Sequence, residues 1–361
     1  MTPHIIGFFA PWIIYSALLV LHFVLPARRV KGYVKNDHSS EPLEYRLNGL
    51  PVMIIAIIGW ILLGYFNVVP YNWLYINRWQ GLAGACTLGL IVSFLIVITA
   101  PPIKSVFIAD FFLGRRWNPQ FFDHRVDVKM FLYLAGATLL ALNILSFAAH
   151  HILLFKPDYS PSVILYSALF FWFLVDYMTF ERVHLYTYDL FAERVGFKLT
   201  WGCLTFYPYF YCVGLWATAH LPNPEASTGY MVASAVIFFT GWTFARGANM
   251  QKFYFKTNPE KSFLGIFAPS VVTDGTHSLL CGGFWAISRH VNYLGEILMA
   301  TGLTLALGYP QVWWIWLYPL YYVLLLTTRE RDDDKRCHQK YGPLWDQYTQ
   351  KVPHRIIPRI Y

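Results

Sequence analysis

The chain has 361 residues, of which 56% are hydrophobic, 19% aromatic and only 13% charged, and its mean hydropathy is +0.40. Soluble domains carry about 25% charged residues, so this composition excludes a soluble globular protein, a disordered chain and a coiled coil, and it predicts a polytopic membrane protein. Five cysteines without paired spacing exclude a disulfide scaffold, and the net charge of +8 is first a signal of membrane topology rather than of nucleic-acid binding.

Nine apolar runs predict membrane-spanning helices in chain order. They lie at about residues 5–26, 50–69, 81–100, 130–149, 163–180, 199–219, 227–244, 294–307 and 312–328. The first run is too long for the apolar core of a signal peptide and lacks a basic segment before it, so we expect no cleavable signal. The predicted fold is an all-α bundle of about nine to ten spans, forming one membrane domain over residues 1–361 with a C-terminal cytoplasmic cap.

Lysines and arginines are concentrated in every second connection between the predicted spans. Of the 28 Lys and Arg residues, 26 lie in connections 1, 3, 5 and 7 and in the tail. The third connection carries Lys104, Arg115, Arg116, Arg125 and Lys129, whereas the second and fourth carry one cation each. The positive-inside rule therefore places the odd-numbered connections and the C-terminal tail in the cytoplasm.

Three segments carry polar residues that topology alone does not require. Residues 246–256, RGANMQKFYFK, place Asn249, Lys252 and Lys256 on one helical face, which suits either a phosphate group or cations that reach the membrane surface. Residues 279–296, LLCGGFWAISRHVNYLGE, gather polar groups at the mouth of the eighth span, where lipid contact is costly and a protein or ligand partner is expected. The tail 329–361 alternates charges with aromatic residues and ends apolar, which predicts that it docks back onto the membrane domain.

These segments resemble the sterol reductases, a family that includes the membrane domain of the lamin B receptor. Residues 279–296 are similar to the family pattern LLxSGWWGxxRHxNYxGD, and residues 329–361 to RxxxDxxCxxKYGxxWxxYxxxVPYRIxPYIY. The chain departs from these patterns at Gly282, Phe284, Ala286, Val291 and Glu296, and His354 and Arg359 replace tyrosines in the tail. The resemblance implies N-terminal spans over residues 1–110 and a catalytic region over residues 111–361.

The resemblance also implies NADPH as cofactor. The family's cofactor contacts correspond to Lys252, Lys256, Trp285, Arg289, His290, Asn292, Arg329, Asp333, Lys340 and Tyr341. The chain has no GxGxxG sequence and no alternation of strands and helices, which excludes a Rossmann site, so side chains must hold the phosphates. No metal site is expected.

The implied reaction is the NADPH-dependent reduction of a sterol C=C bond, with C14 favoured over C7 or C24. An isolated C=C bond is not electrophilic, so a proton must be added before hydride, and aromatic rings in a dry pocket would stabilise the resulting cation. Candidate proton donors are Asp176, Tyr177 and Glu181 near the end of the fifth span, then Glu296 and Tyr348. We expect the first three to be the leading group.

Two alternatives remain open from the sequence. An integral-membrane methyltransferase of the isoprenylcysteine or phospholipid type, using S-adenosylmethionine, shares a short motif similar to residues 289–295. A non-enzymatic sterol sensor predicts missing cofactor residues, whereas these are present. The expected partners are a sterol and the lipid bilayer, with no nucleic acid. The expected location is the endoplasmic reticulum of a eukaryote or the inner membrane of a bacterium.

Overall fold

The computed structural model describes residues 3–36, 40–103 and 106–361. Lys104, which was counted among the cations of the third connection, lies outside the described residues. The chain divides into two compact units, residues 1–224 and 225–361.

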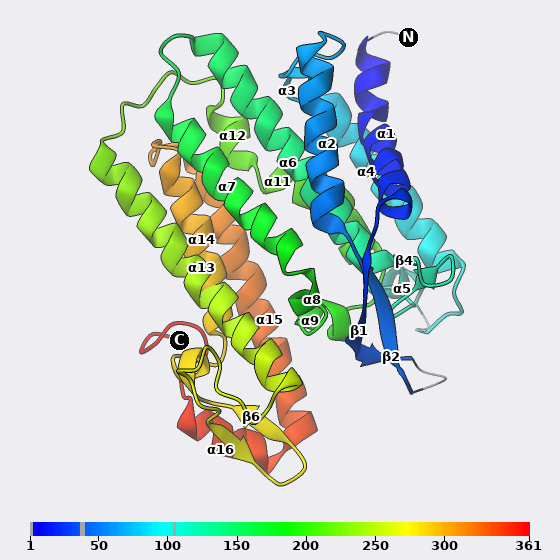
Figure 1. The fold of residues 1–361 in the computed structure, drawn as a ribbon, viewed down its shortest axis with the longest axis vertical. Helices are drawn as coiled ribbons and strands as arrows, with labels where there is room; N and C mark the ends of the chain where they lie inside the picture. Colours follow the sequence, from blue (N-terminus) through cyan, green and yellow to red (C-terminus); the bar gives the residue numbers. More distant parts are fainter. Residues whose placement is uncertain (1–2, 37–39, 104–105) are drawn as a thin grey trace. The chain divides into compact units, whose positions relative to one another are not determined.

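The first unit is built mainly from long helices (Figure 1). They are α1 (Pro3–Val24), α2 (Gly49–Tyr65), α4 (Arg78–Ile98), α6 (Val128–Phe155) and α7 (Pro161–Thr179). The shorter helices of this unit are α3 (Trp73–Ile76), α5 (Phe107–Leu113), α8 (Glu181–His184), α9 (Tyr188–Ala192), α10 (Phe197–Trp201), α11 (Tyr207–Phe210) and α12 (Val213–Thr218).

Helix α6 forms the core of the first unit, because it packs against α2, α3, α7 and α11 and 83% of its most apolar stretch is buried. Its start is fixed by Asp127, whose side chain accepts a hydrogen bond from the backbone N–H of Met130 at 3.0 Å. Ser160 caps α7 in a similar way, and Pro161 occupies the first turn, where a missing N–H costs nothing.

The first connection forms a β-hairpin, which the apolar runs of the sequence do not predict. Strands β1 (Arg28–Lys35) and β2 (Pro42–Leu47) pair antiparallel, and a shorter pair, β3 (Gln120–Phe121) and β4 (Val126–Asp127), follows α5. Val30, Tyr45 and Leu47 point inward and pack with Met130. The alternation of buried and exposed residues along these strands is the signal that a search for spans overlooks.

The predicted sixth span is not one continuous helix. Residues 199–219 fall on α10, a π-helical turn η1 (Gly202–Phe206), α11 and α12. Pro208 lies at the start of α11, where its ring and missing N–H disrupt the helical ladder of the preceding turn. An apolar run reveals its length but not such an interruption.

The second unit consists of three long helices and a cap. Its elements are α13 (Thr228–Thr257), β5 (Val271–Thr273), β6 (Ser278–Leu280), the 3-10 turn η2 (Gly283–Ala286), α14 (Val291–Ala306), the 3-10 turn η3 (Trp313–Trp316), α15 (Leu317–Tyr341) and α16 (Pro343–Lys351). Helices α13 and α14 approach closely through glycines. A methyl group on Gly241 would lie 2.5 Å from the Gly295 carbonyl oxygen, and one on Gly302 would lie 2.6 Å from the Phe238 nitrogen.

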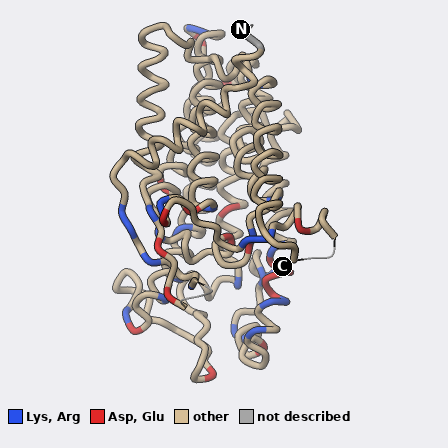
Figure 2. Tube along the Cα trace, turned by 90° about the vertical axis from the view of Figure 1, so that its right-hand side faces the viewer, with Lys and Arg blue, Asp and Glu red and all other residues tan. Residues whose placement is uncertain are grey.

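The chain is a polytopic helical membrane protein, as predicted. Among the described residues, α1 from Ile5, α4, α6, α7 and α13 are long and apolar enough to cross a bilayer. Helix α2 is apolar but has 17 residues, and the eighth predicted span corresponds to α14 with 16 residues. The ninth predicted span is divided between η3 and the first half of α15. Within each unit, Figure 2 shows long helical stretches that carry neither acidic nor basic residues.

Candidate functional site

The segment 279–296 runs through β6 and η2 to the start of α14, and a tight turn opens it. Gln251 of α13 clamps this turn, because its amide Nε2 donates to the Gly282 carbonyl oxygen at 3.1 Å and its Oε1 accepts from the Phe284 N–H at 3.0 Å. Gly283 has φ +63°, and a methyl group there would lie 2.3 Å from Gln251 Nε2. A glycine is therefore required at this position.

Trp285 fixes the same segment against α13. Its indole N–H donates to the Ala248 carbonyl oxygen at 3.0 Å, and its ring packs in a buried cluster with Ala248 and Val291. The Lys252 ammonium lies 5.7 Å from the centroid of the Trp285 ring, within the range of a cation–π contact. The Asn292 side chain donates to Asn249 Oδ1 at 3.4 Å. The structure thus brings the first two polar segments together.

Four consecutive or nearly consecutive residues at this junction carry buried polar atoms with no hydrogen-bond partner in the described structure. They are Ser288 Oγ, Arg289 Nε, His290 Nε2 and Asn292 Oδ1. Leaving a buried polar atom unpaired costs about 1–3 kcal/mol, so native proteins rarely leave several of them together. This run is therefore a place where a polar ligand or ordered water has hydrogen bonds to gain.

The first turns of α14 lie in a strongly cationic environment. Burial, followed by the charges of Lys252, Arg289 and Arg355, lowers the pKa of His290 to about 3. The His290 imidazole is therefore neutral at physiological pH, and it stacks on the Tyr293 ring with centroids 4.8 Å apart. A neutral imidazole can accept a hydrogen bond as well as donate one.

Helix α15 supplies the third polar segment. Arg329, Asp333, Cys337 and Lys340 recur at helical spacing along it. Burial raises the pKa of Asp333, while Lys252 is the largest of the cations that oppose the shift. Lys256, exposed one turn beyond Lys252, interacts electrostatically with Lys340. Basic residues of α13 and α15 therefore surround one site.

Tyr341 and Lys340 close the end of α15. The Lys340 ammonium lies 4.9 Å from the Tyr341 ring centroid, and the Tyr341 ring also contacts His277 edge-on at 5.3 Å. His277 belongs to the turn between β5 and β6, so this hairpin borders the site.

The tail docks against the connection before α14. The backbone N–H groups of Arg289 and His290 donate to the carbonyl oxygens of His354 and Arg355, both at 2.9 Å. Cys281 also packs in a buried cluster with side chains of α16 and the following residue, namely Trp345, Tyr348 and Val352.

The candidate proton donors fall into separate places. Asp176 and Tyr177 lie near the end of α7, where the Tyr177 ring stacks on His184 with centroids 3.9 Å apart. Glu181 lies beyond that helix, in α8, and its carboxylate accepts the backbone N–H of Gly49 at 3.0 Å. Burial raises the pKa of Glu181 to about 7, and the bond from Gly49 opposes this shift. Glu181 thus caps the start of α2 while holding a titratable proton near neutrality.

The other two candidates belong to the second unit. Glu296 is half-buried on α14, one turn after Asn292. Tyr348 lies on α16 inside the apolar cluster of the cap, with its ring stacked on Trp345 at 5.0 Å between centroids. Burial raises the pKa of Tyr348.

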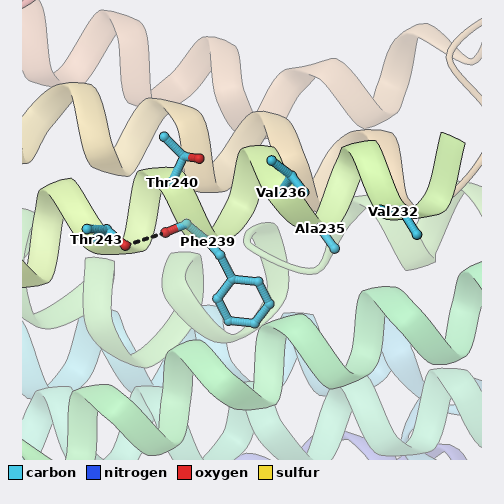
Figure 3. Close-up of a pocket in the computed structure, with 6 residues that line it drawn as sticks. All are labelled: Val232, Ala235, Val236, Phe239, Thr240 and Thr243. Carbon is cyan, nitrogen blue, oxygen red and sulfur yellow. Dashed lines mark hydrogen bonds between the residues drawn. The ribbon is translucent and has the colours of Figure 1, made fainter. Parts of the chain in front are cut away.

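A shallow hollow on α13 lies away from these polar groups. Figure 3 shows that all six of its drawn residues belong to α13: Val232, Ala235, Val236, Phe239, Thr240 and Thr243. The Thr243 hydroxyl donates to the Phe239 carbonyl oxygen of its own helix at 2.8 Å. The lining is mostly apolar and suits a hydrocarbon chain, with no charged side chain to perform chemistry.

Several residues of the site were absent from the sequence expectations. Gln251, Asp334, Glu330 and Arg355 act through partners distant in sequence, whereas Ser288 contributes an unpaired buried hydroxyl. Their neighbours in the sequence could have indicated two of them, because Gln251 lies between Asn249 and Lys252, and Ser288 directly precedes Arg289.

Comparison with known proteins gives a family match over nearly the whole chain. A family model described as "Ergosterol biosynthesis ERG4/ERG24 family" matches residues 3–361. A Delta(14)-sterol reductase of Arabidopsis thaliana is 31% identical over 357 residues, covering 95% of this chain and 93% of the relative. The Delta(14)-sterol reductase TM7SF2 of Mus musculus is 31% identical over 385 residues, covering 99% and 88%.

A relative named for a different activity is also similar. The "Probable 7-dehydrocholesterol reductase" of Acanthamoeba polyphaga mimivirus is 27% identical over 380 residues, covering 99% of this chain and 83% of the relative. The resemblance found in the sequence motifs is therefore confirmed at the level of the family.

Proposed function

The chain belongs to the ergosterol biosynthesis ERG4/ERG24 family of sterol reductases, and from this premise we propose that it reduces a C=C bond of a sterol with NADPH. The observation that carries the proposal is the run of unpaired buried polar atoms at residues 288–292, beside the cations of α13 and α15. Family membership favours this reaction over the methyltransferase that the short motif around Arg289 also allowed.

The residues present fit a dinucleotide. Two phosphate-bearing groups need several fixed cations, and Lys252, Arg289 and Lys340 offer them near one another. The unpaired atoms of His290 and Asn292 offer hydrogen bonds to neutral parts of the cofactor, and the Trp285 ring lies beside the Lys252 ammonium. The proposed contacts are Lys252, Lys256, Trp285, Arg289, His290, Asn292, Arg329, Asp333, Lys340 and Tyr341.

When bound, the cofactor supplies hydride. The chain has to supply a proton first, because an isolated C=C bond is not electrophilic enough to accept hydride directly. Asp176, Tyr177 and Glu181 are the leading candidates for that role. Glu181 supports it physically, because a pKa of about 7 leaves a large share of its carboxyl groups protonated at neutral pH.

Aromatic side chains would stabilise the cation that protonation creates on the sterol. The proposed donor Tyr177 contacts Phe173 and Tyr133 through its ring, with centroids 6.3 and 6.2 Å apart. Ring faces attract positive charge without attacking it, and an apolar surrounding excludes water that would capture the cation.

We propose C14 as the position reduced. Support comes from the relatives named Delta(14)-sterol reductases in Arabidopsis thaliana and Mus musculus. We also propose that the two units form one membrane domain with the nucleotide site in the cytoplasm, as the distribution of cations indicates. The membrane would be the endoplasmic reticulum in a eukaryote or the inner membrane in a bacterium.

The test is sterol analysis of membranes containing the protein. Membranes are supplied with NADPH and, separately, with sterols unsaturated at C14, C7 or C24, and the products are identified by mass spectrometry. Wild type should reduce the C14 substrate, and Arg329→Gln should abolish the product. Lys335→Gln, which removes an exposed cation from the same helix, is the matched control and should retain activity.

A folded protein that binds NADPH and reduces none of the three substrates would refute the proposed reaction. Reduction of the C7 or C24 substrate alone would refute only the position.

A further inference from the structure

The C-terminal segment contains an arginine that the proposed reaction does not use. Resting on the proposed nucleotide site, we propose that Arg355 is a positioning residue, which shares Asp334 with Arg289 and so keeps the Arg289 guanidinium available to an anionic group of the cofactor. Arg355 itself need not touch the cofactor.

Arg355 is anchored by a fully buried carboxylate. Arg355 Nη1 lies 3.2 Å from both carboxylate oxygens of Glu330, whose exposed fraction is 0%. The Tyr361 hydroxyl donates to Glu330 Oε2 at 3.1 Å. A buried carboxylate requires such compensation, so the Glu330 carboxylate fixes where the guanidinium lies.

The other side of the same guanidinium reaches Asp334. Arg355 Nη2 lies 3.6 Å from Asp334 Oδ2, and Arg289 Nη1 lies 3.6 Å from Asp334 Oδ1. The Trp345 indole N–H donates to Asp334 Oδ1 at 3.2 Å and holds the carboxylate in place. Asp334 therefore lies between two arginines without closing a short bidentate pair on either.

The balance of charge explains what Arg355 contributes. Arg355 pairs with both Glu330 and Asp334, Arg289 pairs with Asp334, and Arg331 interacts electrostatically with Glu330. Without Arg355, Arg289 is the cation that the described residues still place within ion-pair distance of Asp334, and Glu330 keeps the Tyr361 hydroxyl. We expect Asp334 to close on Arg289 as a bidentate pair, which would occupy the guanidinium and oppose an incoming phosphate.

The fold also couples Arg355 to the site through its backbone. Its carbonyl oxygen accepts the His290 N–H, and the neighbouring His354 carbonyl oxygen accepts the Arg289 N–H. A purely structural role would therefore also weaken cofactor binding when Arg355 is lost. The experiment has to separate loss of this support from closure of Asp334 on Arg289.

A rescue by removing the Asp334 charge separates them. The full chain is purified in detergent, and the NADPH dissociation constant is measured by quenching of tryptophan fluorescence, alongside KM for NADPH and kcat. Arg355→Gln should raise the dissociation constant about tenfold, within the range for one coupled charge network. Asp334→Asn added to it should return the constant to within about threefold of wild type, because asparagine keeps an oxygen for Trp345 but no charge for Arg289.

Two further variants keep the test decisive. Arg359→Gln removes an exposed cation from the same segment and should leave the constant unchanged. If Arg355→Gln does not fold, Glu330→Gln in the same chain removes the unpaired buried carboxylate, and the Asp334→Asn comparison is made in that background.

The outcomes are distinguishable. An increase in the NADPH dissociation constant of Arg355→Gln that Asp334→Asn does not reverse would overturn the role of Arg355 but leave the proposed reaction intact. An unchanged dissociation constant in Arg355→Gln would have the same meaning. A wild-type protein that does not bind NADPH would refute the proposed function and this role with it. An increase reversed by Asp334→Asn, appearing in KM more than in kcat, supports the proposal.

Discussion

Replacing Glu181 tests whether burial in the first unit raises the pKa of its carboxyl group. The change is Glu181→Gln, which keeps an oxygen to accept the Gly49 N–H but cannot ionise. Glu181 is 8% exposed, and burial raises the pKa of its carboxyl group from 4.5 to about 7. A difference of this size corresponds to about 3 kcal/mol between the protonated and ionised forms.

The sign of the effect follows from which state binds the proton more tightly. The folded protein holds the Glu181 proton up to about pH 7, whereas the unfolded chain releases it near its ordinary pKa. Wild type therefore loses stability as the pH rises from about 4.5 to about 7, by up to about 3 kcal/mol, and this loss is complete above pH 7. The glutamine variant has no such loss.

Thermal unfolding of the purified protein at pH 5 and pH 8 measures this difference. We expect the melting temperature of Glu181→Gln, relative to wild type, to be higher at pH 8 than at pH 5, since other titrating groups cancel in the comparison. Gly49→Ala is the matched structural change, because its methyl group would lie 2.4 Å from Glu181 Oε1 and displace the carboxylate. Parallel pH profiles for Glu181→Gln and wild type would refute the reasoning.

The remaining predictions concern the second unit. Gly283→Ala should lower the melting temperature, because the left-handed backbone at φ +63° costs about 1 kcal/mol and the methyl group clashes with Gln251 Nε2; an unchanged melting temperature would contradict this. Lys252→Met should weaken NADPH binding about tenfold in a fluorescence titration, since it removes a cation beside Trp285; equal affinity would exclude Lys252 from the site. With a pKa of about 3, His290 stays neutral from pH 5 to 8, so NADPH dissociation constants of wild type and His290→Gln should follow parallel pH profiles; diverging profiles would show that it titrates.

The membrane spans were predictable from the sequence where hydropathy alone determines them. Long apolar helices such as α6 and α13 follow from hydropathy, since a bilayer demands both length and internal hydrogen bonding. The interruption at Pro208 and the β1–β2 hairpin were not found, because a count of apolar residues ignores backbone breaks and two-residue alternation.

The polar segments of the second unit were predictable because each carries several polar residues within a short stretch of sequence. The structure brings Lys252, Trp285 and Asn292 near one another, since both segments flank the close pair α13 and α14. Glu330 and Arg355 were missed, because nothing in the sequence pattern of the tail shows that its first and last parts contact each other. Whether each predicted residue contacts NADPH stays a prediction.

The position of Glu181 illustrates a different limit. The sequence placed it beside Asp176 and Tyr177 as one group, and their spacing is compatible with that. The structure directs its carboxylate to the N–H of Gly49, a partner 132 residues away in the chain. Only the folded chain reveals that this carboxyl group caps the start of α2 and also has a pKa near neutrality.

Helix α13 is longer than the hydrocarbon core of a bilayer is thick, so it extends from lipid into water. Its 30 residues extend about 45 Å, whereas the hydrocarbon core of a bilayer is about 30 Å thick. Roughly ten residues must therefore stand clear of the lipid, and by the distribution of charge these are the last ones, which carry Gln251, Lys252 and Lys256. One continuous helix then runs from the depth where a hydrophobic substrate dissolves to the water, where the proposed nucleotide cofactor would bind. A kink introduced midway along α13 would therefore displace one end of the helix relative to the other, although every residue at both ends would be unchanged.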